Sequence, residues 1–244
     1  IMDFVEGRIF WTATLPELDR EERWRIYDAM NETLARLHTI DYEAIGLADY
    51  GRPGNYFARQ ISRWTKQYKA SETGHIPEME RLIEWLPEHI PEDDTTTIVH
   101  GDYRLDNIIF HPTEPKVLAV LDWELSTLGH PLGDFTYHLM QWQMPARDDT
   151  GGSLLGEDLK ALGIPTQEEY VAAYCRRTGR DGIPDLDYFM AYNFFRLAGI
   201  LQGIVGRVRY GTASNPRAAE MAAAVRPLAQ AGWAFARRAG APEG

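Results

Sequence analysis

The 244-residue chain has the composition of a folded globular protein, with 44% hydrophobic and 25% charged residues. Its 36 acidic residues outnumber its 25 basic residues, for a formal net charge of −11, which argues against binding to nucleic acid phosphates through clustered Lys and Arg. The one cysteine, Cys175, cannot form an intrachain disulfide, so we expect a cytoplasmic protein, and the polar residues within the apolar segment 188–208 argue against a membrane span.

Three helices are predicted in the first part of the chain. Pro16 is followed by an acidic run, which favours a helix N-terminus because negative charge there meets the positive end of the helix dipole. Apolar residues then recur at helical spacing until about residue 39: Tyr27, Met30, Leu34 and Leu37. A turn region rich in Gly and Pro leads to a second helix over 56–68 and a third over 77–85.

The middle of the chain changes from helical to strand patterns. Residues 95–99, 107–110 and 117–123 are short segments rich in β-branched side chains, and the segment HPTEPK between the last two predicts a turn because it contains two prolines. We therefore expect a small β-hairpin that holds polar loops. Helical patterns return after it and fill the rest of the chain, over about 134–143, 167–178, 185–207 and 215–238.

Polar residues gather where these short strands end. His100, Gly101 and Asp102 follow the first strand, Asn107 begins the second, and Asp122 lies at the end of the third. Two carboxylates and an amide at neighbouring strand ends supply hard oxygen ligands for Mg²⁺ and a base for a hydroxyl nucleophile. Oxygen ligands without cysteine favour Mg²⁺ over zinc. His111 and His130, which flank the hairpin, are expected to be structural and not metal ligands.

This pattern resembles the aminoglycoside phosphotransferase-like kinases, which are relatives of the protein kinase fold. The motif H-G-D-x-x-x-x-N of that family, its metal-binding Asp and the Gly-Asp that follows are matched in order by His100, Gly101, Asp102, Asn107, Asp122, Gly133 and Asp134. The segments GLADYGRPGNYFARQISRW and FFRLAGILQGI resemble the phosphotransferases related to the kinase-like portion of certain acyl-CoA dehydrogenase fusion proteins more than they resemble antibiotic-modifying members.

The resemblance implies an α+β fold, the mostly helical C-terminal lobe of a kinase-like protein with a small β-hairpin that carries the catalytic and metal loops. Residues 1–10 would be a hinge strand or linker, and residues 11–244 the lobe, with the catalytic hairpin at about 95–124 and substrate-groove helices at about 134–239. The Gly-rich loop of the family and its phosphate-binding Lys belong upstream of the hinge. We therefore expect the N-terminal lobe to be absent from this chain, and the chain to be inactive or nearly so without it.

The resemblance also implies roles for individual residues. Asp102 would orient or deprotonate the substrate hydroxyl, and Arg104 would neutralise charge on the transferring phosphoryl group. Asn107 and Asp122 would hold Mg²⁺ against the phosphates of ATP. The alternative is that the Asp and Asn residues serve only the backbone of tight turns and that Arg104 is a solvated cation.

Two further groups of residues receive roles by the same resemblance. His100 would support the catalytic loop by hydrogen bonding, and Asp134 would fix its backbone, unless Asp134 is the N-cap of a helix over FTYHLMQW. In the opening segment IMDFVEG, backbone groups of Asp3 and Val5 would bind the adenine edge of the nucleotide, with Phe4 in the same hinge.

The leading hypothesis is an ATP- and Mg²⁺-dependent phosphotransferase that phosphorylates a hydroxyl group of a small molecule. The negative charge suits a polycationic aminoglycoside, but the closer resemblance points to a hydroxyacyl-type or other small metabolite. Two alternatives stay open: a non-catalytic kinase-like module that binds nucleotide or a partner, and a Mg²⁺-dependent phosphohydrolase that uses Asp102 and Asp122. A P-loop in GGSLLGED is excluded because Glu157 replaces the required Lys.

Overall fold

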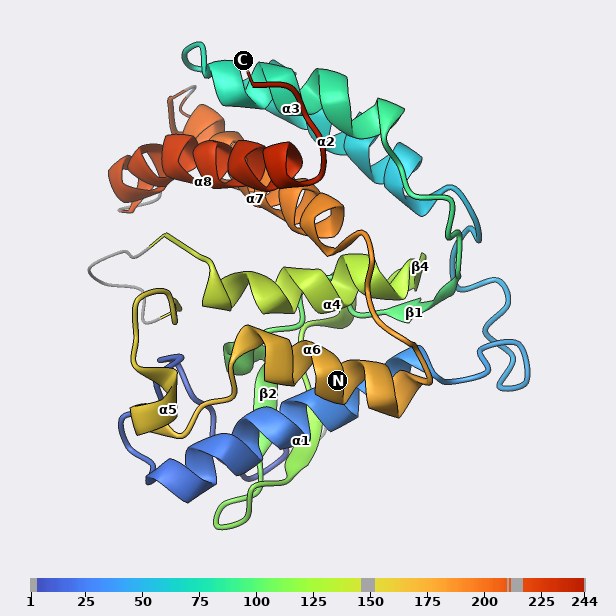
Figure 1. The fold of residues 1–244 in the computed structure, drawn as a ribbon, viewed down its shortest axis with the longest axis vertical. Coiled ribbons are helices and arrows are strands. Elements are labelled where there is room, and N and C mark those ends of the chain that lie inside the picture. The colour runs from blue at the N-terminus through green and yellow to red at the C-terminus, as the bar shows by residue number, and fades with distance from the viewer. Residues whose placement is uncertain (1–3, 146–151, 210, 212–216, 244) are drawn as a thin grey trace. The chain divides into compact units, whose positions relative to one another are not determined.

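The structure, a computed structural model, describes residues 4–145, 152–209, 211 and 217–243, and in these residues it is mostly helical with four short strands (Figure 1). The chain divides into two compact units, Ile1–Pro53 with Thr95–Pro184, and Gly54–Asp94 with Asp185–Gly244. The first unit contains the polar hairpin. The predicted boundary between a hinge and a lobe near residue 10 stays a prediction.

Helix α1 (Arg20–His38) of the first unit begins at a capping aspartate and buries one face. The side chain of Asp19 caps it by accepting hydrogen bonds from the amides of Glu21 and Glu22. The buried face runs through Tyr27, Met30 and Leu34, as predicted, but it continues through His38, while Leu37 is only half-buried. Helix α1 packs against α6 (Gln167–Thr178).

Two antiparallel strand pairs carry the polar loops of the first unit. Strand β2 (Ile108–Phe110) pairs with β3 (Val117–Val120), which confirms the predicted hairpin, and β1 (Thr97–Val99) pairs with β4 (Thr127–Gly129), which the sequence analysis did not predict. The chain passes from β1 to β2 through residues 100–107 and from β3 to β4 through residues 121–126. Since both loops join the same two strand pairs, they lie side by side.

A segment near the N-terminus adds to the hairpin. Arg8 and Phe110 exchange two backbone hydrogen bonds, with N···O distances of 2.8 and 2.9 Å. Only glycine fits at position 7, because a Cβ atom there would collide with the carbonyl oxygen of Phe110 and the side chain of Ile109. The guanidinium of Arg8 also donates to the carbonyl oxygen of His111, at 3.0 Å. The residues that follow the expected hinge are therefore attached to the edge of β2.

The second unit is a group of four helices: α2 (Tyr56–Ser71), α3 (Pro77–Glu88), α7 (Leu186–Arg209) and α8 (Ala218–Arg238). Helix α7 packs against α8 and α2 (Figure 1). Its Tyr192 ring meets the ring of Phe57 edge-on, with centroids 5.0 Å apart. The polar Gln202 of this apolar helix donates to the carbonyl oxygen of Ser71 at 2.6 Å, which satisfies the end of α2. None of the described helices is long and apolar enough to cross a membrane.

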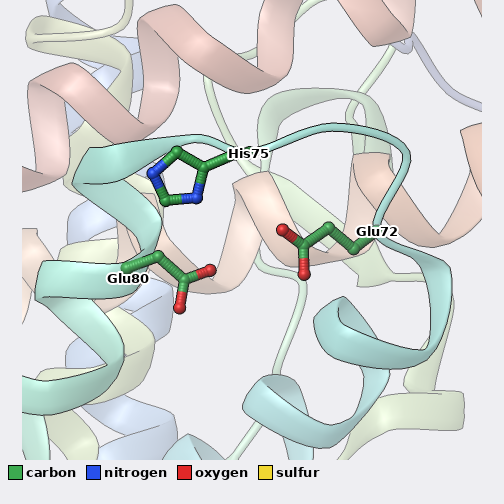
Figure 2. A group of neighbouring side chains, drawn as sticks. All are labelled: Glu72, His75 and Glu80. Carbon is green, nitrogen blue, oxygen red and sulfur yellow. The ribbon is translucent and has the colours of Figure 1, made fainter.

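The connection between α2 and α3 brings three potential ligand side chains together. Figure 2 shows Glu72, His75 and Glu80 close together at this connection. One potential ligand atom from each side chain lies within 4.8 Å of the other two. The ammonium of Lys69 lies 2.5 Å from Glu80 and 3.6 Å from Glu72, and its pKa is raised chiefly by the hydrogen bond to Glu80. Because Lys69 already pairs with both carboxylates, we attribute this cluster to ion pairing across the turn.

The core of the first unit contains a histidine that cannot take up a proton easily. His138 of α4 (Pro131–Leu139) is buried, and its Nε2 atom lies 2.9 Å from the hydroxyl of Tyr170. Burial lowers the pKa of His138 from 6.5 to about 3, although the charge of Asp134 opposes this shift. The folded protein therefore leaves His138 neutral at a pH where the unfolded chain protonates it.

This difference predicts that acid destabilises the protein through His138. Between the unfolded pKa of 6.5 and the folded pKa of about 3, the unfolded state binds one more proton, so the free energy of unfolding falls as the pH falls. The expected slope from this one group is about 1.4 kcal/mol per pH unit. Urea denaturation of the wild type and of His138→Gln between about pH 6.5 and pH 4 measures it, and equal slopes for the two proteins would contradict the prediction.

Candidate active site

The loop that follows β1 brings together the residues of the predicted catalytic motif. The side-chain Nδ2 atom of Asn107 donates to the backbone oxygen of Asp102 at 2.9 Å and to its Oδ2 atom at 3.2 Å. Asn107 is buried, whereas the side chain of Asp102 keeps 21% of its surface exposed. The loop therefore holds one carboxylate in a fixed position with access to solvent.

The loop that follows β3 carries Asp122 to the same place. The pairing of β2 with β3 extends by one step, because the amide of Leu121 donates to the carbonyl oxygen of Asn107 at 2.8 Å. Asp122 comes next, is exposed, and has the left-handed backbone angles φ 62° and ψ 55°. A non-glycine residue in this region costs roughly 1 kcal/mol or more, and such strain concentrates at functional sites.

His100 links these two loops. Its Nδ1 atom accepts a hydrogen bond from the amide of Asp102 at 3.2 Å, so the ring hydrogen is on Nε2, which donates to the carbonyl oxygen of Leu121 at 2.8 Å. One imidazole therefore holds the backbone of Asp102 and the residue that precedes Asp122.

Asp134 fixes the catalytic loop from within the core. Its Oδ2 atom accepts from the amide of His100 at 2.6 Å, and its Oδ1 atom accepts from the amide of Gly101 at 2.8 Å. The Nε2 atom of His38 lies 3.2 Å from Oδ2. Burial raises the pKa of Asp134, but hydrogen bonds from His38 and from the two amides outweigh it and leave the pKa lowered overall. Asp134 is therefore a buried carboxylate with at least three donors.

The alternative role of Asp134 as a helix N-cap is wrong. Helix α4 begins three residues earlier, at Pro131, and His130 caps it by accepting the amide of Leu132 at its Nδ1 atom. Proline suits the first position of a helix because it has no amide hydrogen to satisfy there. The ring of His111 likewise accepts from the amide of Glu114, at 3.1 Å. Both histidines therefore serve the backbone, as predicted.

Arg104 lies beside the carboxylate of Asp102. Its Nε atom is 3.8 Å from Oδ2 of Asp102, and its Nη2 atom is 2.5 Å from Oδ2 of Asp106. Burial would lower the pKa of Arg104, but the charges of Asp102 and Asp106 raise it overall. With 53% of its side chain exposed, the guanidinium can turn toward an anion outside the loop.

The predicted adenine-binding residues are described only in part. Asp3 lies outside the described residues, Phe4 is 91% exposed, and Val5 is half-buried. Their contact with a nucleotide stays a prediction.

The oxygen atoms of this site fit Mg²⁺. Because the amide nitrogen of Asn107 is engaged with Asp102, the Oδ1 atom of Asn107 remains for a ligand, and Asp122 offers an exposed carboxylate. Protein sites for Mg²⁺ need only one or two such oxygens, since water and substrate phosphates complete the octahedron.

His38 is a residue of this site that the sequence analysis missed. It comes from the end of α1, far from the motif in the sequence, and reaches Asp134 only in the folded chain. One signal was available, since His38 stands four residues after the buried Leu34, on the core face of the helix.

Comparison with known proteins identifies the family. The profile of the Phosphotransferase enzyme family matches residues 1–189. The chain belongs to this family. It is also 45% identical over 240 residues to acyl-CoA dehydrogenase family member 10 of Mus musculus, covering 98% of this chain and 22% of that protein. Acyl-CoA dehydrogenase family member 11 of Homo sapiens is 42% identical over 240 residues, which are 98% of this chain and 30% of that protein. The predicted resemblance is confirmed, and the chain spans less than a third of these relatives.

Solved structures agree with the family. A protein from Ralstonia eutropha JMP134, described as a candidate aminoglycoside phosphotransferase, is 55% identical with a TM-score of 0.93, covering 97% of this chain and 72% of that one. A choline kinase from Cryptosporidium parvum shares the fold at 11% identity, with a TM-score of 0.61 and coverage of 97% and 71%. A spectinomycin phosphotransferase, solved with ADP and spectinomycin, does so at 11% identity with a TM-score of 0.56, covering 96% and 70%.

The backbone of the catalytic loop predicts a strong effect of Gly101→Ala. Gly101 has φ +86°, and a Cβ atom there would lie 2.7 Å from the carbonyl oxygen of Leu125. We expect the substitution to lower the free energy of unfolding by about 1–3 kcal/mol, measured by urea denaturation. Gly74→Ala is the control, because nothing lies within 4 Å of its added Cβ, and its effect should stay within about 0.5 kcal/mol. Equal effects of the two substitutions would contradict this account of the loop.

Proposed function

We propose that the protein is a phosphotransferase that transfers the terminal phosphoryl group of ATP to a hydroxyl group of a small molecule, in the presence of Mg²⁺. The observation that carries this proposal is that His100 holds together the loop of Asp102 and Asn107 and the loop that carries Asp122. Phosphoryl transfer needs mainly positioning and electrostatic stabilisation, which such a fixed polar constellation supplies.

Each residue has a role in this reaction. Asp102 accepts the hydrogen bond, and then the proton, of the acceptor hydroxyl, and Asn107 keeps its carboxylate in place. Asn107 and Asp122 would hold Mg²⁺, which supplies neutralisation of the phosphate charge. Arg104 turns from Asp106 toward the transferring phosphoryl group and balances its negative charge.

We infer that the acceptor is a small metabolite that carries a hydroxyl group, of the hydroxyacyl type. The inference is supported by the relatives named acyl-CoA dehydrogenases, which are 42–45% identical over 98% of this chain. The formal net charge of −11 would also suit a cationic acceptor such as an aminoglycoside or choline. A panel of these three acceptor classes therefore belongs in the assay.

We also propose that efficient transfer requires a Gly-rich loop and a phosphate-binding Lys, which the family places before the hinge. The assay should therefore compare the 244-residue chain with the longest protein that its gene encodes. Transfer by the 244-residue chain at the full rate would contradict this part of the proposal.

The role of Asp102 predicts that Asp102→Asn abolishes transfer. Removing a general base lowers kcat by roughly 10²–10⁴-fold, and the isosteric amide should leave the fold intact by circular dichroism. Transfer of labelled phosphate from ATP to the acceptor panel measures the effect. Asp106→Asn is the matched control in the same loop and should cost less than about tenfold, because Asp106 pairs with Arg104 and stands at a variable position of the matched motif. Wild-type transfer by Asp102→Asn would refute the assignment.

Two further assays, phosphate release and ATP binding, separate the alternatives. A phosphohydrolase would release phosphate from a phosphorylated substrate without any nucleotide, and a binding module would bind ATP without transferring phosphate. Either result would replace the proposed function.

The role of Asp122 predicts a changed metal requirement. We expect Asp122→Asn to raise the Mg²⁺ concentration needed for half-maximal transfer by roughly tenfold or more, because one anionic ligand is lost. Glu124→Gln, an exposed neighbour in the same turn, should leave that concentration unchanged. A Mg²⁺ titration of transfer rates measures both, and an unchanged requirement in Asp122→Asn would remove Asp122 from the metal site.

A further inference from the structure

A buried chain of hydrogen bonds runs from helix α6 to the catalytic loop. The hydroxyl of Tyr174 lies 2.7 Å from Nδ1 of His38, and Nε2 of His38 lies 3.2 Å from Oδ2 of Asp134. Asp134 in turn accepts the amides of His100 and Gly101. We propose that His38 and Tyr174 are positioning residues for the catalytic loop of the phosphotransferase, an inference that rests on the proposed function.

Donors and acceptors can be assigned along the series of hydrogen bonds from Tyr174 through His38 to Asp134. Asp134 is a carboxylate, since its pKa is lowered overall, and it can only accept hydrogen bonds. His38 must therefore donate from Nε2. Burial raises the pKa of Tyr174, which keeps its hydrogen, and among the described residues the bond to His38 is the one that this hydroxyl makes. In the Nε2–H tautomer of His38, the Nδ1 atom is an acceptor, so Tyr174 donates to it and both donors point toward Asp134.

The surroundings hold both residues in place. The carbonyl oxygen of His38 accepts a hydrogen bond from the hydroxyl of Thr97 in β1, at 3.0 Å. The ring of Tyr174 stacks on the ring of Phe135, the residue after Asp134, with centroids 3.9 Å apart. His38 is therefore fixed to the strand that leads into the catalytic loop, and Tyr174 to the helix that carries Asp134.

This series of hydrogen bonds affects the catalytic loop because Asp134 holds the amides of His100 and Gly101, the two residues that precede Asp102. Without the donor from His38, the buried carboxylate keeps the bonds to His100 and Gly101 but loses its side-chain donor, which bonds to the same Oδ2 atom as the amide of His100. A displacement of about 1 Å at a reacting group can cost roughly 10²-fold in rate. His38 and Tyr174 do not touch a substrate in this account and act through Asp134.

A positioning role differs from a structural role in what it changes. If His38 and Tyr174 only stabilise the core, their variants unfold more easily, but the folded fraction transfers phosphate at the normal kcat. If they position the loop, kcat falls while the KM for ATP stays the same, and the amides of His100 and Gly101 change their environment in the folded protein.

The test compares Tyr174→Phe and His38→Phe with a matched control, Tyr170→Phe. Tyr174→Phe removes one hydroxyl and keeps the stacked ring. Tyr170 lies one turn earlier on α6, is equally buried, and bonds to His138 instead of His38. His38→Gln is the conservative variant, because its side-chain amide can still donate to Asp134.

We expect Tyr174→Phe to lower kcat by roughly 10-fold and His38→Phe by roughly 100-fold at unchanged KM for ATP, with partial recovery in His38→Gln. Tyr170→Phe should keep the wild-type kcat. Amide NMR signals of His100 and Gly101 in labelled protein should shift in the His38 and Tyr174 variants and not in the control.

Unchanged amide signals in Tyr174→Phe and His38→Phe would overturn the proposal, as would a kcat for Tyr170→Phe as low as that of Tyr174→Phe. If His38→Phe does not fold, Tyr174→Phe still decides. If the wild type transfers no phosphate to any acceptor, the proposed function fails, and the amide signals alone then decide whether His38 and Tyr174 position the loop.

Discussion

The buried carboxylate of Asp134 is the constraint on which the active site depends. Burying an unpaired charge costs several kcal/mol, so the first unit can enclose Asp134 only if donors surround it. Two of the donors are the amides of His100 and Gly101, and the third is the ring of His38. The chain therefore cannot complete its core without placing the catalytic loop, which couples the stability of the core to the geometry of the site.

The strand pairing then fixes the position of the second loop, residues 121–126, relative to the first. Since β1 pairs with β4 and β2 with β3, the loops 100–107 and 121–126 have to run side by side, and His100 bonds across them to Leu121. Asp122 keeps its left-handed backbone within this frame. The polar groups are therefore oriented before any ligand arrives, and preorganised groups need no reorganisation during the reaction.

The sequence predicted the parts of this site that are close together in the chain. The β-branched segments and the two prolines between them indicated the β2–β3 hairpin, and the motif from His100 to Asn107 has a fixed local spacing. Strand β4 was not predicted because its three residues are too few to show a periodic pattern, and its pairing with β1 depends on the tertiary fold. The roles of His38 and Tyr174 were not predicted, because the hydrogen bonds from Tyr174 through His38 to Asp134 join three helices. The spacing of α1 indicates only that His38 is buried, not what it contacts.

The same core shows why His38 serves the loop and His138 does not. His138 has a pKa of about 3, so it stays neutral, and it bonds to Tyr170 in much the way that His38 bonds to Tyr174. The two pairs differ in what lies beyond the imidazole, because only His38 goes on to a carboxylate. The hydrogen bond between His138 and Tyr170 does not continue to a charged group. In the pair of His38 and Tyr174, the charge of Asp134 requires His38 to donate toward the carboxylate. That asymmetry connects α6 to the catalytic loop through α1 and α4.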